Sequence, residues 1–577
     1  MREGLIFLVM AVLAFSIYSN SLNGPFLFDD EASIPKNTTI RLEKLTLEGL
    51  GAAGLRNRPV AYMSFALNYY FHQYNVRGYH VVNILIHITT GILLYLFVKT
   101  TLNLLLGQKD NTIIPESLNP TFIAFFTALI WLVHPIQTQS VSYIVQRMNS
   151  MAAMFYIMSM LLYARARLAE EKRKKTALFA GCAVAALLAL GSKPIAATLP
   201  VFIFLYEFYF FRNLDLSWLR RCFPLFACVL IILAVVAYIY LGDNPIERIL
   251  GEYGRLDFTL TQRVLTELRV VLFYISLLIF PHPSRLNLEH DFALSHSLLE
   301  PATTLLSMGV IIALIGLAIY TAKKDRLLSF CILWFFGNLV IESSVIGLDI
   351  IFEHRTYLPS MLLILMIVTL AYRYIKPKWL RIAVLCGIAL VCSVWTHERN
   401  YVWADSVTFW SDCVKKSPAK ARPHSNLGRA LAENGRPDQG IHHLNEALRI
   451  KPGYAVAHNN LGTALEQSGN LKEAVQHYSE AVRLVPGFVN AHYNLGVALH
   501  RQGKLREAAK YYSEALRVKP NHAMAHNNLG VVLQSQGKLG EAVSHYSEAL
   551  RINPDYTEAR SNLERAQRLT KKSSKGP

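Results

Sequence analysis

The chain has 577 residues, of which 53% are hydrophobic and only 17% charged, and its mean hydropathy is +0.28. A soluble domain carries about 25% charged residues, so this composition excludes an ordinary soluble protein. The net charge of +18 would fit a nucleic-acid partner. However, the Lys and Arg residues cluster in short loops between apolar segments, as the positive-inside rule requires of a membrane protein, and the sequence contains no nucleic-acid-binding motif.

Apolar segments recur along the chain up to about Thr396, where the composition changes. A bilayer needs about 20 apolar residues per helix, and we predict eleven spans, with soft ends, at residues 5–22, 80–104, 120–134, 149–166, 176–192, 195–211, 222–241, 302–321, 328–345, 357–374 and 379–396. Segment 266–280 contains Glu267 and Arg269. We expect it to be an interfacial or re-entrant helix, because a full crossing would move the basic cluster at 323–326 to the outer side.

This topology divides the chain into parts with different expected locations. Residues 1–396 form a polytopic membrane domain with a cytoplasmic N-terminus, and residues 397–417 form a linker helix. An odd number of spans puts the C-terminal part on the outer side. The long loop 23–78 is also outside, and its amphipathic stretch 62–71 is predicted to lie on the membrane surface.

After residue 417 the sequence repeats with a period of 34. Proline, Leu-Gly, alanine and tyrosine positions follow this period, as in Pro418, Pro452, Pro486, Pro520 and Pro554. This pattern resembles the tetratricopeptide repeat, a helix–turn–helix unit whose small residues let two helices touch. Residues 418–570 are therefore predicted to form an α-solenoid of four repeats and a capping helix, followed by a basic disordered tail at 571–577.

Two polar positions recur within the repeats. An asparagine precedes each leucine and could bind an extended peptide backbone, or could only bridge neighbouring helices. These residues are Asn426, Asn460, Asn494, Asn528 and Asn562. A histidine recurs two residues before the first four of them, at 424, 458, 492 and 526. We interpret these histidines as repeat consensus, because successive repeats lie too far apart for two of them to share a metal ion.

Two adjacent carboxylates, Asp29 and Asp30, follow the first apolar segment. Such a pair could bind a metal, accept a proton or lie in a solvated turn. As a general base, one carboxylate would take the proton of an acceptor hydroxyl that attacks a sugar carbon. The phosphate of a lipid-linked sugar would then leave toward outer cationic groups. The candidates for that role are Arg58, Lys193, His354 and Arg355, although Lys193 could instead be a snorkelling lysine.

Several motifs occur in a fixed order along the chain. They are Phe28–Asn37, Arg58-Pro59 with Ser64–Tyr69, Gly78–His87, the His-Pro motif at His134–Val141, Lys193, and Glu353–Ser360. As an ordered set they resemble the transmembrane and tetratricopeptide-repeat O-mannosyltransferases. The chain departs from that pattern at Gln137-Thr138-Gln139 and at Gln146–Asn149, where an acid is lost in each case. Its repeat array is also shorter than is common in the animal members.

The resemblance implies an all-α fold, with a polytopic GT-C-type glycosyltransferase domain followed by the repeats. It implies transfer of a sugar from a polyprenyl phosphate to a Ser or Thr hydroxyl of a protein on the outer face. The catalytic acid would be Asp29 or Asp30. The residues expected to bind the donor are Arg58, His134, Lys193, Glu353, His354 and Arg355. The short form suggests a bacterial inner-membrane protein with periplasmic repeats that bind the acceptor or a partner protein.

The sequence does not define the sugar, the acceptor or a cofactor, although a divalent cation is compatible with the acid pair. One alternative is a membrane-anchored scaffold without catalytic activity, whose repeats recruit partners for envelope assembly. Such a scaffold needs one span and not eleven. Another alternative is a transporter of lipid-linked sugars, for which pseudo-symmetric halves and polar groups at the bilayer midplane are expected. The polar groups of this chain instead gather near one surface.

Overall fold

The computed structural model describes residues 3–54, 58–107, 119–241, 247, 250–251 and 253–573. Within these ranges the regular structure is entirely helical, so the predicted all-α fold is confirmed. The chain divides into two compact units, Met1–Asp405 and Ser406–Pro577. The boundary lies within the predicted linker 397–417.

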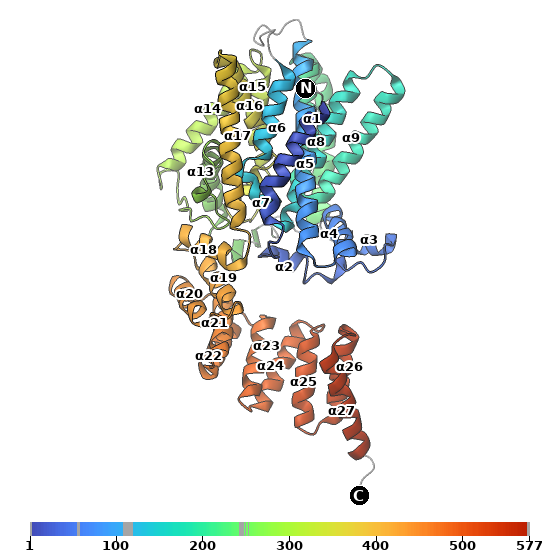
Figure 1. Cartoon of the computed structure of the whole chain (residues 1–577), viewed down its shortest axis with the longest axis vertical. Coiled ribbons are helices and arrows are strands. Elements are labelled where there is room, and N and C mark those ends of the chain that lie inside the picture. The colour runs from blue at the N-terminus through green and yellow to red at the C-terminus, as the bar shows by residue number, and fades with distance from the viewer. Residues whose placement is uncertain are drawn as a thin grey trace. The chain divides into compact units, whose positions relative to one another are not determined.

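The first unit is a bundle of long helices with short helices at one end (Figure 1). Its α-helices are α1 Glu3–Tyr18, α2 Asp29–Ser33, α3 Leu47–Gly54, α4 Pro59–His72, α5 Val76–Leu106, α6 Pro120–Leu132, α7 Thr138–Val141, α8 Arg147–Leu168, α9 Lys172–Ser192, α10 Leu199–Tyr206, α11 Leu216–Leu241, α13 Leu260–Ile279, α14 Thr303–Thr321, α15 Arg326–Leu339, α16 Ser360–Tyr374 and α17 Lys378–Tyr401.

Helix α5 lies at the centre of this bundle and packs against α1, α6 and α8. Its apolar residues pack against these neighbours, and several of its buried polar groups have partners. For example, the two ring nitrogens of His87 bind the Tyr357 hydroxyl at 2.8 Å and the Leu132 carbonyl at 2.9 Å. Pairing of this kind removes the penalty of burying an imidazole in an apolar core.

Six helical segments are long and apolar enough to cross a membrane, which supports a membrane protein. They are Glu3–Ser21, Val76–Leu106, Lys172–Ser192, Pro194–Phe211, Thr303–Thr321 and Lys378–Tyr401. The pair Pro120–Leu132 and Pro135–Val141, bent by 53°, would be a seventh. Each of the eleven predicted spans overlaps a helix, but by this criterion the described residues contain at most seven spans.

Several of the predicted spans fail this length and hydropathy criterion for a clear physical reason. The predicted span 328–345 ends as helix α15 at Leu339, just before the polar run Glu342-Ser343-Ser344. Helices α15 and α16 have only 14 and 15 residues, which is short of the bilayer thickness. Helix α8 carries Arg147 at its start and Arg165 and Arg167 at its end.

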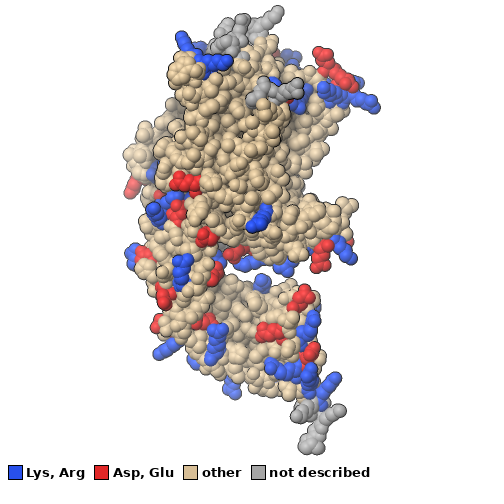
Figure 2. Space-filling view, viewed as in Figure 1, with Lys and Arg blue, Asp and Glu red and all other residues tan. Residues whose placement is uncertain are grey.

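The surface of the first unit supports the membrane interpretation. In Figure 2 a broad band of this unit shows few charged side chains, and most of the Lys and Arg residues lie toward its ends. Exposed apolar side chains cover long helices, including Leu8 on α1, Leu187 on α9 and Ile319 on α14. In water such a surface would be costly, whereas lipid tails solvate it.

Helices α2, α3 and α4 lie at the same end of the bundle, which we call the α2 end (Figure 1). Helix α4 includes the predicted amphipathic stretch 62–71. It buries Phe65 and exposes Phe71, whose side chain is 68% exposed. Its position on a membrane surface stays a prediction.

Segment 266–280 coincides with the C-terminal part of α13, a 20-residue helix that is capped by Thr259 and Gln262 and ends at Ile279. Its buried face contributes Val270, Tyr274 and Leu277 to an apolar cluster with Ile136 and Phe335. Helix α13 therefore packs into the bundle on one side. Three charged residues interrupt its apolar sequence, and its interfacial or re-entrant position stays a prediction.

The second unit consists of helix pairs with the predicted 34-residue period. Its helices are α18 Ser406–Lys416, α19 Ala421–Glu433, α20 Pro437–Ile450, α21 Ala455–Gln467, α22 Leu471–Leu484, α23 Val489–Arg501, α24 Leu505–Val518, α25 Ala523–Ser535, α26 Leu539–Ile552 and α27 Thr557–Ser573. The tail was predicted to be disordered from residue 571, but α27 continues through Ser573, and residues 574–577 lie outside the described part.

Close packing inside each repeat depends on a glycine. A Cβ atom at Gly462, Gly496 or Gly530 would lie 2.6–2.7 Å from the tyrosine ring of the second helix. The turn between the two helices uses another glycine with positive φ, such as Gly503 at 76°, a conformation that strains other residues. These requirements explain why the two glycines recur with the repeat.

We expect the substitution Gly496→Leu to destabilise the third repeat by about 1–3 kcal/mol, because the new side chain overlaps the Tyr512 ring and forces the helices apart. The matched control is Gly540→Ala, since a Cβ atom at Gly540 meets open space. Hydrogen exchange of α23 and α24 in the full-length protein would measure the difference. Unchanged protection in Gly496→Leu would contradict the packing argument.

Candidate functional site

The polar residues singled out in the first unit gather at its α2 end. The contacts converge on a short segment, Tyr143–Asn149, which includes the turn Ile144–Gln146 and the start of α8. This segment binds the acid pair of α2 on one side and the residues around Lys193 on the other.

Asp30 is buried, with only 1% of its surface exposed. Its two carboxylate oxygens accept hydrogen bonds from the amide of Leu27 at 3.0 Å and from the amide of Val145 at 2.6 Å. Burial raises the pKa of Asp30 to about 8, and the charge of Asp29 raises it too, whereas the amide hydrogen bonds oppose this shift. Asp30 thus fixes α2 against the Tyr143–Asn149 segment.

Asp29 is exposed, unlike its neighbour. Its backbone N–H donates to the hydroxyl of Tyr143 at 2.9 Å, and the same hydroxyl contacts the Asp29 side chain. The Tyr143 ring is buried and stacks on Trp403. The two adjacent acids therefore have different environments, one accessible and one enclosed.

Arg147 is a fully buried cation next to this acid pair. Its guanidinium donates to Asn83 and Asn68 side chains at 2.7 Å each and to the Tyr79 carbonyl at 2.9 Å. It also lies over the Phe65 ring at 4.7 Å. Its donors are used to hold α4 and α5 together, so Arg147 has a structural role at the start of α8.

Lys193 is buried and forms an ion pair with Glu342, with 2.7 Å between Nζ and Oε1. Its Nζ also donates to Asn149 at 3.1 Å, and the Asn149 amide donates to the His354 carbonyl at 2.8 Å. Burial acts to raise the pKa of Glu342, but the charges of Lys193, Arg355 and Arg58 hold it below its usual value. This ion pair excludes a snorkelling role for Lys193.

Arg58 adds a second cation to this cluster. It is half-buried, and its guanidinium contacts the sulfur of Met148 at 3.0 Å. No ion pair links Arg58 to a carboxylate within the described residues. It lies close enough to Lys193, Glu342 and His354 to act on all three electrostatically.

The Glu353–Arg355 motif forms a turn whose three side chains have different partners. The Glu353 carboxylate accepts from the Asn287 amide at 2.5 Å and lies 3.1 Å from His290. His354 binds Gln139 through both its amide and its ring Nδ1. Arg355 donates to the carbonyls of Asp349 and Ile350 and lies 3.7 Å from Glu267.

His134 has another role than the sequence suggests. Its Nδ1 accepts from the Ile136 amide at 3.3 Å, and its Nε2 donates to the Leu278 carbonyl at 3.1 Å. Both ring nitrogens therefore bind backbone groups, and the histidine ties the His-Pro turn to the end of α13. In this arrangement it has no nitrogen left for a donor phosphate.

The asparagines of the repeats bridge neighbouring helices, as one of the two interpretations proposed. Each of Asn460, Asn494, Asn528 and Asn562 donates to the side chain 35 residues earlier. Asn426 lies on α19 at the start of the series. The bridging does not exclude peptide binding, because each bridging amide has a second N–H and a carbonyl oxygen.

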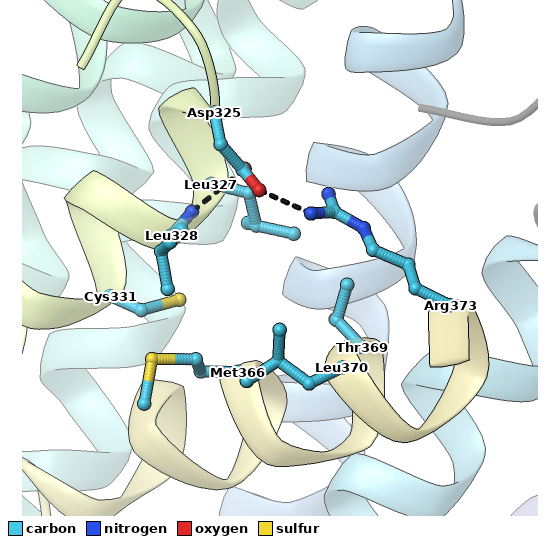
Figure 3. A pocket seen from close by; sticks show the side chains of 8 residues that line it. All are labelled: Asp325, Leu327, Leu328, Cys331, Met366, Thr369, Leu370 and Arg373. Atoms are coloured by element: carbon cyan, nitrogen blue, oxygen red, sulfur yellow. Dashed lines mark hydrogen bonds and ion pairs between the residues drawn. The ribbon is translucent and has the colours of Figure 1, made fainter. Parts of the chain in front are cut away.

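A small cavity lies elsewhere in the first unit. Figure 3 shows a cavity of about 10 Å³ between α15 and α16, lined by Asp325, Thr369 and Arg373. Asp325 pairs with Arg373 there and accepts the Leu328 amide. This space suits one water molecule. Within the described residues, no group of three or more His, Cys, Asp or Glu side chains is arranged to hold a metal ion.

Four residues of the cluster were missed by the sequence analysis: Tyr143, Gln139, Asn149 and Glu342. Glu342 lies inside a predicted span, and a charged residue inside a span is by itself a functional indication. The other three are neutral polar residues. Only the tertiary contacts distinguish them from solvated ones.

Family models match the repeats. Models described as tetratricopeptide repeat match residues 421–441 and 493–557, and a model described as TPR repeat matches residues 466–503. Among solved structures, the chain is similar to TTC0263, a thermophilic TPR protein of Thermus thermophilus, with 20% identity and a TM-score of 0.26. That match covers 31% of this chain and 95% of the other.

Curated relatives match a much larger part of the chain. A protein O-mannosyl-transferase of Caenorhabditis elegans is 25% identical over 457 residues, which cover 74% of this chain and 60% of the relative. The protein O-mannosyl-transferase Tmtc3 of Drosophila melanogaster is 23% identical over 523 residues, covering 78% and 55%. The chain thus spans less than two thirds of the length of either relative. By these matches the chain is a relative of the transmembrane and tetratricopeptide-repeat protein O-mannosyl-transferases.

Proposed function

We propose that this protein is a membrane glycosyltransferase that moves a sugar from a polyprenyl-phosphate donor to a Ser or Thr hydroxyl of a protein. The reaction would take place at the α2 end, on the outer face of the membrane, and in a GT-C type of domain. The observation that carries the proposal is one exposed carboxylate, Asp29, at the same end as a cluster of cations around Lys193. The names of the curated relatives support the reaction class.

In this proposal Asp29 and Asp30 have different roles. Asp29 is accessible, so its carboxylate is the candidate general base. Asp30 is enclosed and bound by two amides, and it is a positioning residue that sets the orientation of α2. Because two neighbouring carboxylates repel each other, uptake of a proton by buried Asp30 would favour the charged form of its exposed neighbour.

The chemical step is a substitution at the anomeric carbon of the sugar. The acceptor oxygen forms a bond to that carbon while the bond from the carbon to the phosphate oxygen breaks. The acceptor proton passes to Asp29, and the lipid phosphate leaves with the bonding electron pair. Cations that face this phosphate would stabilise the charge that develops on it.

Arg58 and Lys193 are the candidates that would face the phosphate. Around Lys193, four cations (Arg58, Lys193, Arg263 and Arg355) lie near two carboxylates, Glu267 and Glu342. An incoming phosphate would balance part of the excess positive charge. The N–H donors of the Arg58 guanidinium are suited to binding a phosphate. In this proposal Glu353, His354 and Arg355 form the turn beside Lys193, and His134 holds the adjacent turn.

The repeats are proposed to bind the acceptor or a partner protein. Their asparagines could use the remaining amide groups to hold an extended peptide without recognising its sequence. The alternative of a scaffold without catalytic activity makes the same prediction for the repeats but none for Asp29. The enzyme test below therefore separates the two.

The first prediction concerns Asp29. In the purified full-length protein in nanodiscs, we expect Asp29→Asn to reduce transfer of radiolabelled mannose from a polyprenyl phosphate to protein by at least about 100-fold, because general-base catalysis contributes about 10²–10⁴-fold. Glu31→Gln, which changes another acid of α2, is the matched control and should transfer normally. If Asp29→Asn is properly inserted in the membrane and transfers label at the wild-type rate, Asp29 is not the general base.

A failure to detect transfer with mannose does not by itself decide between the hypotheses, so the assay uses a set of polyprenyl-phosphate sugars. Periplasmic extract serves as the acceptor. Protein that is folded and inactive with every donor would overturn the proposed transferase and favour the scaffold.

A second prediction concerns the Lys193–Glu342 ion pair. Glu342→Gln should destabilise the first unit by about 3–5 kcal/mol, because it leaves a buried ammonium without its counter-ion. The double variant Lys193→Met/Glu342→Gln should regain part of that loss, since no buried charge stays unpaired. Thermal unfolding of the wild type, the single variants and the double variant in detergent would measure these changes in stability as a double-mutant cycle. Additive losses in the double variant would contradict the pairing.

Transfer activity separates the structural role of this pair from its proposed role in donor binding. If Lys193 faces the phosphate, the double variant recovers stability but loses donor binding, seen as a raised KM for the donor. Equal KM values in the double variant and the wild type would remove Lys193 from the phosphate site and leave Arg58 to be tested in the same way.

A further inference from the structure

Each of three repeats contains a pair of histidines that face each other. The first histidine lies at the start of the first helix and the second lies 19 residues later on the second helix. The Nδ1 atoms of the two rings are 3.2 Å apart in His424–His443, 3.0 Å apart in His458–His477 and 2.9 Å apart in His526–His545. The feature is therefore a pair of histidines on two helices, and not only the first histidine that recurs in the sequence.

A backbone carbonyl fixes the orientation of the first ring in every pair. The Nε2 atom of His424, His458 and His526 lies 3.0–3.1 Å from the carbonyl oxygen of Pro418, Pro452 and Pro520, respectively. A carbonyl can only accept, so the ring proton is on Nε2. The Nδ1 atom then carries a lone pair that points at the second ring.

This arrangement matches the way in which proteins hold metal-ligating histidines. Such a histidine usually donates its other ring N–H to a backbone carbonyl or a carboxylate, which fixes its tautomer and orientation.

The distance between the two nitrogens also fits a metal ion. With metal–nitrogen bonds of about 2.05 Å, nitrogens 2.9–3.2 Å apart subtend an angle of about 90–103° at the metal. Such an angle lies between that of two adjacent ligands in an octahedral or square-planar complex and that in a tetrahedral one. For an ion to replace the hydrogen bond, the second ring moves its proton from Nδ1 to Nε2 and both rings tilt, so that their Nδ1 lone pairs converge beside the line that joins the two nitrogens.

Surface grooves border two of the three pairs. A surface groove of about 570 Å³ borders His526 and His545, and its lining includes Glu548. A second groove of about 520 Å³ borders His443. Glu548 is paired with Arg551, so water from the groove would complete the coordination of an ion held by two protein nitrogens.

We propose that the three histidine pairs His424–His443, His458–His477 and His526–His545 are two-ligand sites for a divalent transition-metal ion, and that a bound ion links the two helices of its repeat. The affinity should follow the order Cu²⁺ above Ni²⁺ and Zn²⁺. This proposal is independent of the proposed transferase activity.

The third repeat provides an internal comparison. It keeps the first histidine, His492, whose Nε2 binds the Pro486 carbonyl at 2.8 Å. The second position is occupied by Tyr511, and the buried Nδ1 of His492 has no hydrogen-bond partner. The third repeat therefore has half of a site and should bind no ion at this position.

The test uses the full-length protein without a histidine tag, in nanodiscs, titrated with Cu²⁺ and with Zn²⁺. The variant His443→Tyr/His477→Tyr/His545→Tyr introduces the residue that the third repeat itself carries, so it should fold. We expect it to bind three fewer metal equivalents than the wild type. The variant Tyr511→His should bind one more, and His500→Gln, outside the pairs, should bind the same number.

Electron paramagnetic resonance of bound Cu²⁺ supplies a second measurement. The spectrum should show coupling to two imidazole nitrogens in the wild type, and this coupling should disappear in the triple variant. Equal metal content in the wild type, the triple variant and Tyr511→His would overturn the proposal. If the triple variant does not fold, the gain or lack of one equivalent in Tyr511→His decides the question.

Discussion

The segment Tyr143–Asn149 is the constraint on which the α2 end of the first unit depends. Its Val145 amide binds the Asp30 carboxylate, its Arg147 guanidinium holds α4 and α5, and its Asn149 side chain joins Lys193 to the His354 turn. This one short segment thus connects parts of the chain that are far apart in sequence. Because these groups are buried, each of them requires a partner, and the mutual requirement fixes the position of all of them.

This arrangement explains how acidic and cationic groups can coexist at one end of an apolar bundle. A buried charge is stable only when it is paired or hydrogen-bonded. Asp30, Arg147 and Lys193 all meet this condition, while Asp29 stays accessible. The same end therefore combines a rigid frame with an exposed carboxylate, Asp29, which is the combination that a preorganised catalytic site needs.

The second unit follows a different rule, in which the same contacts recur every 34 residues. The glycine–tyrosine packing and the asparagine bridges repeat because each helix pair buries its apolar face against the next pair. The histidine pairs repeat only three times, since Tyr511 interrupts them. A feature that is not needed for packing can vary between repeats, and this variation is what makes the pairs a candidate for a separate function.

The sequence by itself determined the all-helical fold, the repeat period and the change of composition near residue 396, because hydrophobic periodicity and turn residues act locally. It also identified Asp29, Asp30, Lys193 and the Glu353–Arg355 motif as residues of interest. Only the tertiary structure decided which acid is exposed, that Glu342 neutralises Lys193, that His134 binds backbone groups, and that the recurring histidines have partners 19 residues later. These outcomes depend on long-range contacts and on burial, which no local pattern of residues encodes.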